Sequence, residues 1–448
     1  MAQIFPFRGY RYNEPKAGCL DDLVSDPYDK INGELQDMYY EKSPNNIVRI
    51  IKGKTYPNDT SDDNQYTRAA GFLKTWVDEG VLHRDPEPSI YVYDQEYAVP
   101  GKPGDVRTRK GFVASCRLMS YEEGGVKPHE RTLAGPKADR LRLMRATKAQ
   151  FGQIFMLYPD PEHLVDNLLD EARAEIAPVI AKDRFQDNHK LYRVSNPQMV
   201  RALQDIMLKK QLFIADGHHR YETALAYRDE MRGKVSQTDD YETIENRMIT
   251  FVSFDDPGLL VLPTHRLIKN LSGFVPEALI KGMEEFFELE MFAFSDETSR
   301  KGALQSVSES LKENAETGHV IGILLHGQDQ FLTAKLKNTS LLDRIVKDET
   351  NEDFKRLDVV MLHSIVLEHL LKITKEDLAQ ERNVEYVRSM EAGVDAMAAG
   401  GYQAFFMLNP TKTVEVKNVA AAGIRMPQKS TDFYPKLVTG LVLNKLSL

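Results

Sequence analysis

The sequence predicts a mixed α/β fold, and two features of the chain lead to this prediction. Short apolar runs typical of buried strands alternate with longer segments in which apolar residues recur every three or four positions, as in amphipathic helices. The composition, with 42% hydrophobic and 28% charged residues, is that of an ordinary globular protein. A chain of 448 residues corresponds to two or three domains and can bury a large core.

The first 181 residues are expected to contain helices and strands in alternation. An apolar stripe over residues 69–77 predicts a helix at 64–79, which Gly80 would end. Strands are expected at residues 90–99, 111–119 and 154–158, and the glycine- and proline-rich segment between the first two resembles a hairpin loop. Two further helices are expected at residues 136–151 and 162–181.

The remaining elements suggest a division of the chain into three regions. A strand is expected at 212–215, a helix at 221–232, and strands at 246–254 and 259–262. An α-β-α-β-β order follows, at residues 276–287, 289–294, 298–314, 320–325 and 331–336. The last part has expected helices at 354–371 and 386–399 and a strand at 403–408. We therefore expect regions at 1–270, 271–345 (a small α+β module) and 346–448.

Charge, cysteine content and hydropathy exclude several classes of protein. The net charge of −9 disfavours a general nucleic-acid binder, because such proteins neutralise phosphates with Lys and Arg. Two cysteines cannot form a disulfide framework, and we expect Cys19 and Cys116 to be small buried residues. The N-terminus has no apolar signal segment, and no apolar run is long enough to span a bilayer. The expected location is the cytoplasm, without a membrane partner.

The run Asp216-Gly217-His218-His219-Arg220 lies between an expected apolar strand and an expected helix. Glycine permits a tight turn and a close approach of ligand to backbone. The helix would begin with unpaired N–H groups and the positive end of its dipole. Two imidazoles and a guanidinium add directed donors for phosphate oxygens. The run therefore predicts an anion site.

The alternative is structural: Asp216 would cap the helix while the histidines satisfy nearby carbonyls. A metal site is disfavoured, because adjacent His218 and His219 would not easily turn both rings to one ion and no HExxH or CxxC pattern supplies further ligands. We therefore expect no metal held by the protein alone. The sequence also lacks the phosphate loop of NTPases, the GxGxxG of dinucleotide-binding proteins and the GxSxG of hydrolases.

A second polar cluster runs from residue 127 to residue 140. His129 and Glu130 supply an imidazole and a carboxylate, and Lys137 and Arg140 supply cations near a helix start, which suits an acid/base group and a phosphate clamp. A solvated basic helix would explain the cations equally well. Smaller polar signals, each also open to a structural interpretation, are Tyr28, Asp29, His265, Arg266, Lys429, Ser430, Thr431 and Lys436.

These motifs resemble a bacterial and archaeal family long described as a domain of unknown function and often labelled ParB-like or as a helix-turn-helix regulator. The resemblance runs essentially end to end. It rests on Pro6 to Gly9 (with Arg8), Pro27-Tyr28-Asp29, His129-Glu130, Ile214 to Tyr221, Pro263 to Arg266, and Met426-Pro427-Gln428-Lys429-Ser430-Thr431. One departure is Asp26, where proline is expected in the turn.

The resemblance implies a core similar to the ParB/sulfiredoxin fold, with large elaborations and the α-β-α-β-β module inserted. It also implies a free-serine kinase that makes O-phosphoserine, with inorganic pyrophosphate or a nucleotide as donor and Mg²⁺ bound mainly through the donor's phosphates. Region 1–270 would bind phosphate, and region 346–448 would return to the same cleft.

The same resemblance suggests roles for individual residues. His218, His219 and Arg220 would hold the transferring group, and Lys137, Arg140, Lys429 and Lys436 the rest of the donor. Asp216, or else Glu130, would accept the hydroxyl proton. A homodimer is compatible with this function. The alternatives are a ParB-like DNA-binding regulator and a non-catalytic sensor of a phosphorylated ligand.

Overall fold

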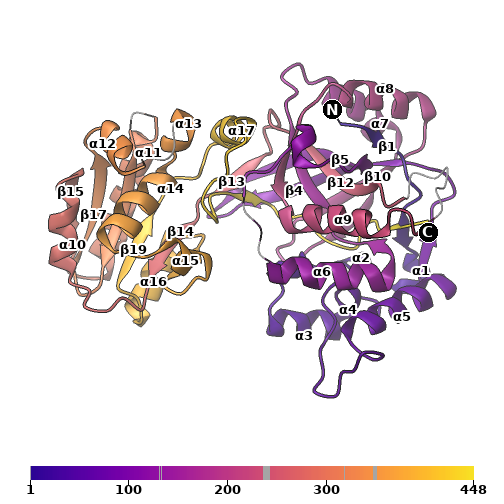
Figure 1. The fold of residues 1–448 in the computed structure, drawn as a ribbon, viewed down its shortest axis with the longest axis horizontal. Helices are drawn as coiled ribbons and strands as arrows, with labels where there is room; N and C mark the ends of the chain where they lie inside the picture. The colour runs from indigo at the N-terminus through magenta and orange to yellow at the C-terminus, as the bar shows by residue number, and fades with distance from the viewer. Residues whose placement is uncertain are drawn as a thin grey trace. The chain divides into compact units, whose positions relative to one another are not determined.

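The computed structural model describes residues 2–130, 132, 134–235, 243–316, 318–346 and 351–447. The chain packs into two compact units. Unit 1 consists of Met1–Pro128, Thr132–Leu260 and Pro435–Leu448, and unit 2 of His129–Arg131 and Val261–Tyr434. Both units contain helices and strands (Figure 1), so the predicted mixed α/β class is confirmed. The three predicted regions remain a prediction.

Unit 1 is built on a mixed sheet that has nine strands in the described part of the chain, in the order β6-β11-β8-β12-β5-β4-β10-β9 with β1 beside β5. The pairs β6–β11 and β8–β12 are parallel and the other pairs are antiparallel. The strands are β1 (Ile4–Phe5), β4 (Ile90–Val99), β5 (Lys102–Arg117), β6 (Val126–Lys127), β8 (Ile154–Tyr158), β9 (Val179–Lys182), β10 (Asn188–Val194), β11 (Leu212–Asp216) and β12 (Asn246–Ser253). This order places β11, the strand before the predicted turn, inside the sheet.

Two small strand pairs and a set of helices complete unit 1. The pairs are β2 (Tyr10–Tyr12) with β3 (Leu82–Arg84), and β7 (Ala149–Gln150) with β21 (Asn444–Lys445). The helices are α1 (Glu14–Ala17), α2 (Leu20–Leu23), η1 (Tyr28–Lys30), α3 (Gly33–Lys42), α4 (Val48–Ile51), α5 (Gln65–Asp78), η2 (Tyr121–Glu123), α6 (Ala134–Thr147), α7 (Leu164–Glu175), α8 (Pro197–Met207) and α9 (His218–Met231). Helix α9 packs on β8 and α6, and α6 packs on α5 (Figure 1).

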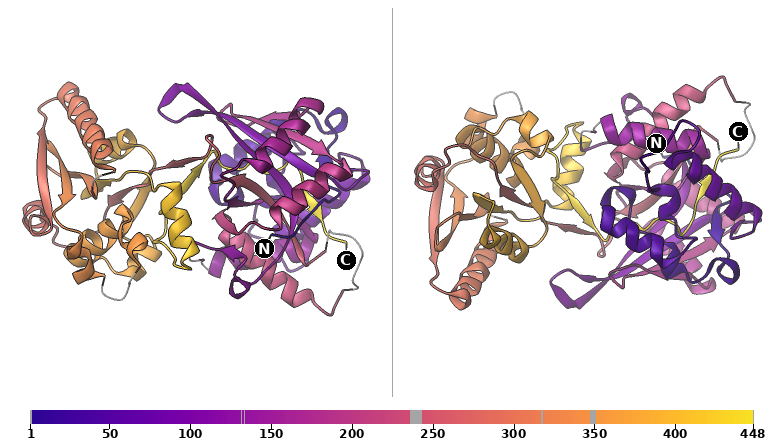
Figure 2. Two further views of the ribbon diagram at one scale, coloured as in Figure 1. Left: turned by 90° about the horizontal axis from the view of Figure 1, so that it is seen from above. Right: turned by 90° about the horizontal axis from the view of Figure 1, so that it is seen from below.

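Unit 2 contains an antiparallel sheet, with six strands among the described residues, in the order β15-β17-β16-β19-β14-β18. Alternate residues of β16 enter two separate cores, Ile321 and Ile323 on one face and Val320 and Leu324 on the other, as the two-residue period of a strand requires. Helices cover both faces (Figure 2). The strands are β14 (His265–Ile268), β15 (Phe287–Ala293), β16 (Val320–Leu325), β17 (Gln330–Leu336), β18 (Val384–Val387) and β19 (Ala404–Met407).

The α-β-α-β-β order predicted for residues 276–336 is confirmed, as α10-β15-α11-β16-β17. These strands share their sheet with β14, β18 and β19. The helices of unit 2 are α10 (Pro276–Met283), α11 (Glu297–Asn314), α12 (Ser340–Ile345), α13 (Glu352–Lys355), α14 (Asp358–Met361), the π-helix η3 (Leu362–Leu370), α15 (Lys375–Ala379), α16 (Met390–Ala399) and α17 (Thr413–Ala421). A short pair, β13 (Leu260–Leu262) with β20 (Asp432–Tyr434), completes the described strands.

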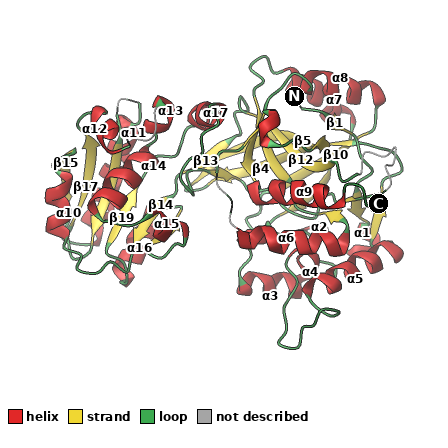
Figure 3. Ribbon diagram, viewed as in Figure 1, coloured by secondary structure: helices red, strands yellow, loops and turns green. Residues whose placement is uncertain are grey.

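Several predicted helices were wrong in extent. Figure 3 shows the observed helices in red. The helix expected at 162–181 ends at Glu175, because Pro178 disfavours helical backbone in the residue before it, and β9 follows. The helix expected at 386–399 begins only at Met390, where Ser389 caps it, after strand β18. The helix expected at 354–371 is broken into α13, α14 and η3.

Two further observations concern membrane association and the cysteines. No helix in the described residues combines the length and the apolar character needed to cross a bilayer. Cys116 is buried in the unit 1 core as expected, but Cys19 is exposed, so the prediction for Cys19 was wrong. Cys19 directly precedes the short helix α2, whose buried residues are Leu20 and Leu23.

Candidate functional site

The predicted turn is formed where β11 ends and α9 begins. Asp216 is the last residue of β11, and Gly217 follows with φ +95°, in the left-handed region that favours glycine. A Cβ atom at Gly217 would lie 3.1 Å from Nε of Arg220, so glycine also leaves room for that guanidinium. Helix α9 begins at His218, three residues earlier than predicted, and no side chain caps its first turn.

Asp216 is the anionic centre of this turn. Its carboxylate accepts a hydrogen bond from Arg220, one helical turn further on, and lies 3.5 Å from the Lys436 ammonium. Burial acts to raise the pKa of Asp216, but Lys436, Arg220 and other nearby cations together hold that pKa below its usual value. Asp216 is therefore ionised at neutral pH, and the chain's C-terminal segment contributes directly to the turn.

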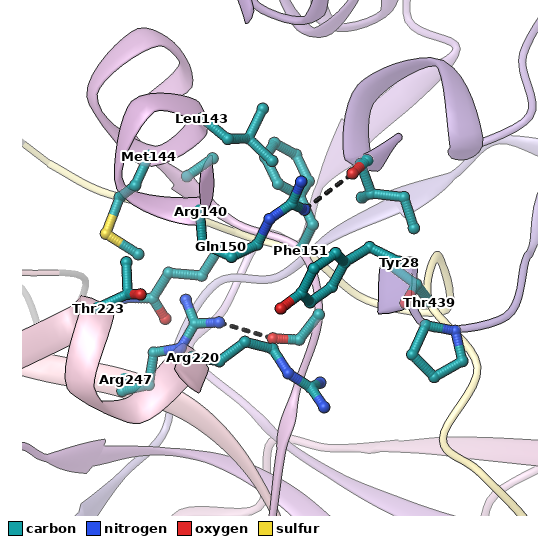
Figure 4. Close-up of a pocket in the computed structure, with 14 residues that line it drawn as sticks. Tyr28, Arg140, Leu143, Met144, Gln150, Phe151, Arg220, Thr223, Arg247 and Thr439 are labelled. Carbon is teal, nitrogen blue, oxygen red and sulfur yellow. Dashed lines mark hydrogen bonds between the residues drawn. The ribbon is translucent and has the colours of Figure 1, made fainter. Parts of the chain in front are cut away.

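A hollow of unit 1 lies beside this turn (Figure 4). Its free space, counted together with the open mouth, is about 480 Å³. Three arginines face it, and no Asp or Glu occurs among the described residues that line it. The lining consists of Pro27, Tyr28, Ile51, Arg140, Leu143, Met144, Ala149, Gln150, Phe151, Gly152, Arg220, Thr223, Arg247 and Thr439.

Two of the three arginines are neutralised by carboxylates. Arg140 donates from Nε to its neighbour Asp139 over 2.8 Å and stacks on the Tyr28 ring, with 3.9 Å from the guanidinium carbon to the ring centre. Arg220 donates to Asp216 and to the carbonyl of Gln153. These pairs fix both guanidinium groups at the wall of the hollow.

Arg247 is different, because no carboxylate among the described residues neutralises it. It comes from β12, is 3% exposed, and donates from Nη2 to the Gly152 carbonyl over 2.6 Å (Figure 4). Its Nε and Nη1 atoms are buried without a hydrogen-bond partner in the described structure. Burial, and then the nearby Arg220 charge, lower the pKa of Arg247 to about 9. A buried cation with free donors beside a second cation is the arrangement that an anionic ligand would stabilise.

The first turn of α9 adds polar groups. His218 is buried, and its charge is among those that lower the pKa of Asp216. Burial lowers the pKa of His219, so its ring is neutral at pH 7. Lys137, from α6, forms a 2.9 Å ion pair with Glu222 of α9. Lys137 and His219 thus lie by the same helix start, although neither lines the hollow.

The predicted site residues near the N-terminus do not all line the hollow. Tyr28 lines the hollow, and Asp29 is exposed beside it in η1. Arg8 is half-buried between β1 and β2 and does not line the hollow. Asp26, where proline was expected, accepts hydrogen bonds from Tyr39 (2.8 Å) and Arg184 (2.7 Å), which explains an acidic residue at this position.

The other predicted site residues belong to unit 2: His129, Glu130, His265, Arg266, Lys429, Ser430 and Thr431. His129 Nε2 lies 3.0 Å from Thr431 Oγ1, and Lys429 accepts a 3.0 Å hydrogen bond from Arg266 through its carbonyl. Burial lowers the pKa of His265 to about 3. Arg131, in the same predicted cluster, lies outside the described residues.

Sequence reasoning missed Arg247, and a signal for it existed. Asn246–Ser253 is an apolar strand in which every residue is buried, and Arg247 is its charged residue. A charge inside a buried strand is uncommon unless it is paired or binds a ligand. The charged residue inside the strand predicted at 246–254 therefore indicates a ligand-binding role for Arg247.

The described residues contain no group of three or more His, Cys, Asp or Glu side chains placed to hold a metal ion. Mg²⁺ in phosphate-transferring sites commonly takes few protein ligands and several substrate oxygens. The lining of the hollow has three arginines and, among the described residues, no carboxylate, which suits an anion.

No curated protein matches the sequence significantly. Among solved structures, a mutant free serine kinase in complex with ADP has a TM-score of 0.36 at 12% identity, over 73% of this chain and 92% of that chain. A conserved hypothetical protein from Pyrococcus furiosus has a TM-score of 0.34 at 13% identity, over 72% and 90% of the two chains. SbnI with C-terminal truncation, from Staphylococcus aureus, has a TM-score of 0.33 at 9% identity, over 72% and 84%. Residues 4–360 match the model of the family described as "Protein of unknown function (DUF1015)", and the chain belongs to this family.

Proposed function

We propose that this protein is a small-molecule phosphotransferase that binds a phosphate group of its substrate in the unit 1 hollow. The observation that carries the proposal is Arg247, a buried cation with two free donor atoms and no carboxylate partner in the described structure. Arg220 and Arg140 line the same hollow. Planar guanidinium groups suit phosphate oxygens, which accept several directed hydrogen bonds at once.

The reaction would be an in-line transfer. The bond from the transferring phosphorus to the donor's leaving oxygen breaks, a bond to the acceptor's hydroxyl oxygen forms, and the hydroxyl proton passes to a carboxylate. Catalysis of this kind depends mainly on positioning and on charge stabilisation. Arg220 and Arg247 would stabilise charge on the phosphoryl oxygens. Asp216, kept ionised by its cationic neighbours, would orient the hydroxyl and take its proton.

The acceptor and donor are proposed from the family resemblance of the motifs. The acceptor is free L-serine, the product is O-phospho-L-serine, and the donor is inorganic pyrophosphate or a nucleotide. Lys137 and Lys436 would bind the remaining charge of the donor, and both lie by the β11–α9 turn through their ion pairs with Glu222 and Asp216.

Mg²⁺ would accompany the donor and be held mainly by its phosphates, where it would offset their charge. The chain's own contribution is to bind and orient the phosphate with arginines. A homodimer and a cytoplasmic location are compatible with this function.

The proposal is tested by phosphorus NMR of the purified protein with Mg²⁺, L-serine, and pyrophosphate, ADP or ATP in turn. We expect an O-phosphoserine signal with one donor, and a loss of roughly 10²–10³ in rate for Arg220→Ala, the size of effect seen when one strong transition-state donor is removed. The matched control is Arg117→Met, because Arg117 is half-exposed on β5 and does not line the hollow.

Near-normal turnover by a folded Arg220→Ala protein would remove the hollow from the mechanism. No product from any donor, together with phosphate binding that depends on Arg247, would favour the sensor alternative. Salt-sensitive binding of duplex DNA without turnover would favour the regulator alternative.

A further inference from the structure

A second group of buried polar atoms lies within unit 2. Arg266 of β14 and Tyr386 of β18 are directly opposite each other in the antiparallel register, and His363 comes from the π-helix η3. The Nε atom of Arg266, the hydroxyl of Tyr386 and Nε2 of His363 are all buried and have no hydrogen-bond partner in the described structure. The Arg266 charge acts on both His363 and Tyr386. Buried polar atoms are nearly always paired, so these three unpaired atoms require an explanation.

No carboxylate among the described residues compensates the charge of Arg266. The side chain is 1% exposed, and its two terminal nitrogens donate to the main-chain carbonyls of Thr264 and Lys429. Lys429 has a left-handed backbone with φ +57°, a conformation that lysine rarely adopts. Glu381 and Glu130 raise the pKa of Tyr386, but neither is among the groups that shift the pKa of Arg266.

Apolar core residues and a π-helix lie near Arg266. Ile268, two residues after Arg266 and on the same face of β14, packs in a core with Leu362 and Val366 of η3. Burial, followed by the Arg266 charge, lowers the pKa of His363, so its ring is neutral. A π-helical segment is rare and occurs often at functional sites. Isolated charge in such a place is expensive unless an opposite charge joins it.

We propose that Arg266, Tyr386 and His363 form a binding site for a small carboxylate. A carboxylate supplies one negative charge for the single guanidinium, and its two oxygens can accept from Nε of Arg266 and from the Tyr386 hydroxyl. His363 can donate from Nε2 in one of its neutral tautomers. A phosphate dianion would bring a second charge that this cluster does not balance. The inference rests on unit 2 alone and does not depend on the proposed phosphate site.

The test compares Tyr386→Phe with Tyr402→Phe. The hydroxyl of Tyr386 is unpaired, whereas that of Tyr402 bonds to Glu385 over 2.7 Å, outside the cluster. Acetate is titrated into each ¹⁵N-labelled full-length protein at constant ionic strength, with chloride and inorganic phosphate as comparison anions. The His363 ring nitrogen signals report occupancy. We expect saturable acetate binding to wild type, weakened about tenfold by Tyr386→Phe and unchanged by Tyr402→Phe.

A purely structural cluster gives a different result. Removing an unpaired buried hydroxyl leaves thermal stability unchanged or raises it, so Tyr386→Phe is expected to fold. The melting temperature of Tyr386→Phe without acetate checks that the variant is folded. The proposal is overturned if acetate does not move the His363 signals more than chloride does, if phosphate binds in its place, or if Tyr386→Phe binds acetate as wild type does. Ordered water alone at these three atoms in an acetate-soaked crystal would overturn it as well.

Discussion

Replacing Arg247 by methionine separates a structural role of this residue from a ligand-binding role. The lowering of its pKa from 12.5 to about 9, at about 1.4 kcal/mol per unit, corresponds to roughly 5 kcal/mol as the upper limit of the cost of holding the charge in this position. Methionine removes that cost but leaves the Gly152 carbonyl without its donor, a loss of about 1–3 kcal/mol. The balance predicts that Arg247→Met stabilises the ligand-free protein, by at most roughly 2–4 kcal/mol, as observed for other buried ionic groups.

Inorganic phosphate should stabilise the wild-type protein more than it stabilises Arg247→Met. A ligand at a hundred times its dissociation constant stabilises a protein by about 2.7 kcal/mol, and a lost hydrogen bond to a charged group weakens binding by roughly 10- to 100-fold. At that concentration wild type should gain about 2.7 kcal/mol from inorganic phosphate, whereas Arg247→Met should gain only roughly 0.4–1.4 kcal/mol.

The assay is scanning calorimetry in buffer free of phosphate and sulfate, repeated with added phosphate. Arg117→Met, whose side chain is 49% exposed on β5, is the control and should change stability by no more than about 0.5 kcal/mol. If Arg247→Met instead lowers ligand-free stability by 2 kcal/mol or more and retains the full phosphate response, Arg247 is a structural residue and the reasoning is wrong.

Three further predictions concern the β11–α9 turn. Gly217→Ala should lower the free energy of unfolding by roughly 1–2 kcal/mol and reduce phosphate affinity, because φ +95° strains alanine and its Cβ would meet Arg220. The control Gly71→Ala, in an open helical position, should lower neither stability nor phosphate affinity. Asp216→Asn should bind phosphate more tightly in calorimetric titration, since a negative charge is lost, yet turn over at least 10²-fold more slowly; undiminished turnover would exclude Asp216 as the base. The His219 pKa, measured by NMR, should lie below 6.5 without ligand and rise on addition of phosphate. The stability of the ligand-free protein should fall as the pH drops below about 6.5, because the unfolded chain then binds a proton that the folded chain does not. A pKa unaffected by phosphate would place His219 away from the anion.

The turn could be predicted because its determinants are local. An apolar strand, a glycine and a helix with polar residues in its first turn are consecutive in sequence, and the structure has them in that order at Leu212–Asp216, Gly217 and His218–Met231. The motifs of that segment also indicated a family described only as of unknown function, which the match over residues 4–360 confirms. Mixed α/β class followed from patterning in the same way.

The assembly of the hollow could not be predicted, because it depends on contacts between distant segments. Arg247 faces the hollow only because β12 pairs with β8 in a parallel register, Ile249 opposite Ile154. Lys436 reaches Asp216 because residues after Pro435 return to unit 1. Neither pairing has a signature in a single sequence, since strand order is set by packing of whole sheet faces.

The breaks in predicted helices have a related cause. An apolar period over 354–371 is compatible with one helix, yet the chain forms two short helices and a π-helix that carries buried His363. Periodicity reports which face is buried but not where backbone hydrogen bonds change partners.

The most direct test of the proposed phosphate site is a crystal structure of the protein grown with inorganic phosphate in place of other anions. We predict phosphate in the unit 1 hollow, with its oxygens within hydrogen-bonding distance of Nε or Nη1 of Arg247 and of the Arg220 guanidinium. A hollow filled only with water at a phosphate concentration that stabilises the protein would contradict the account, because the anion would then bind elsewhere.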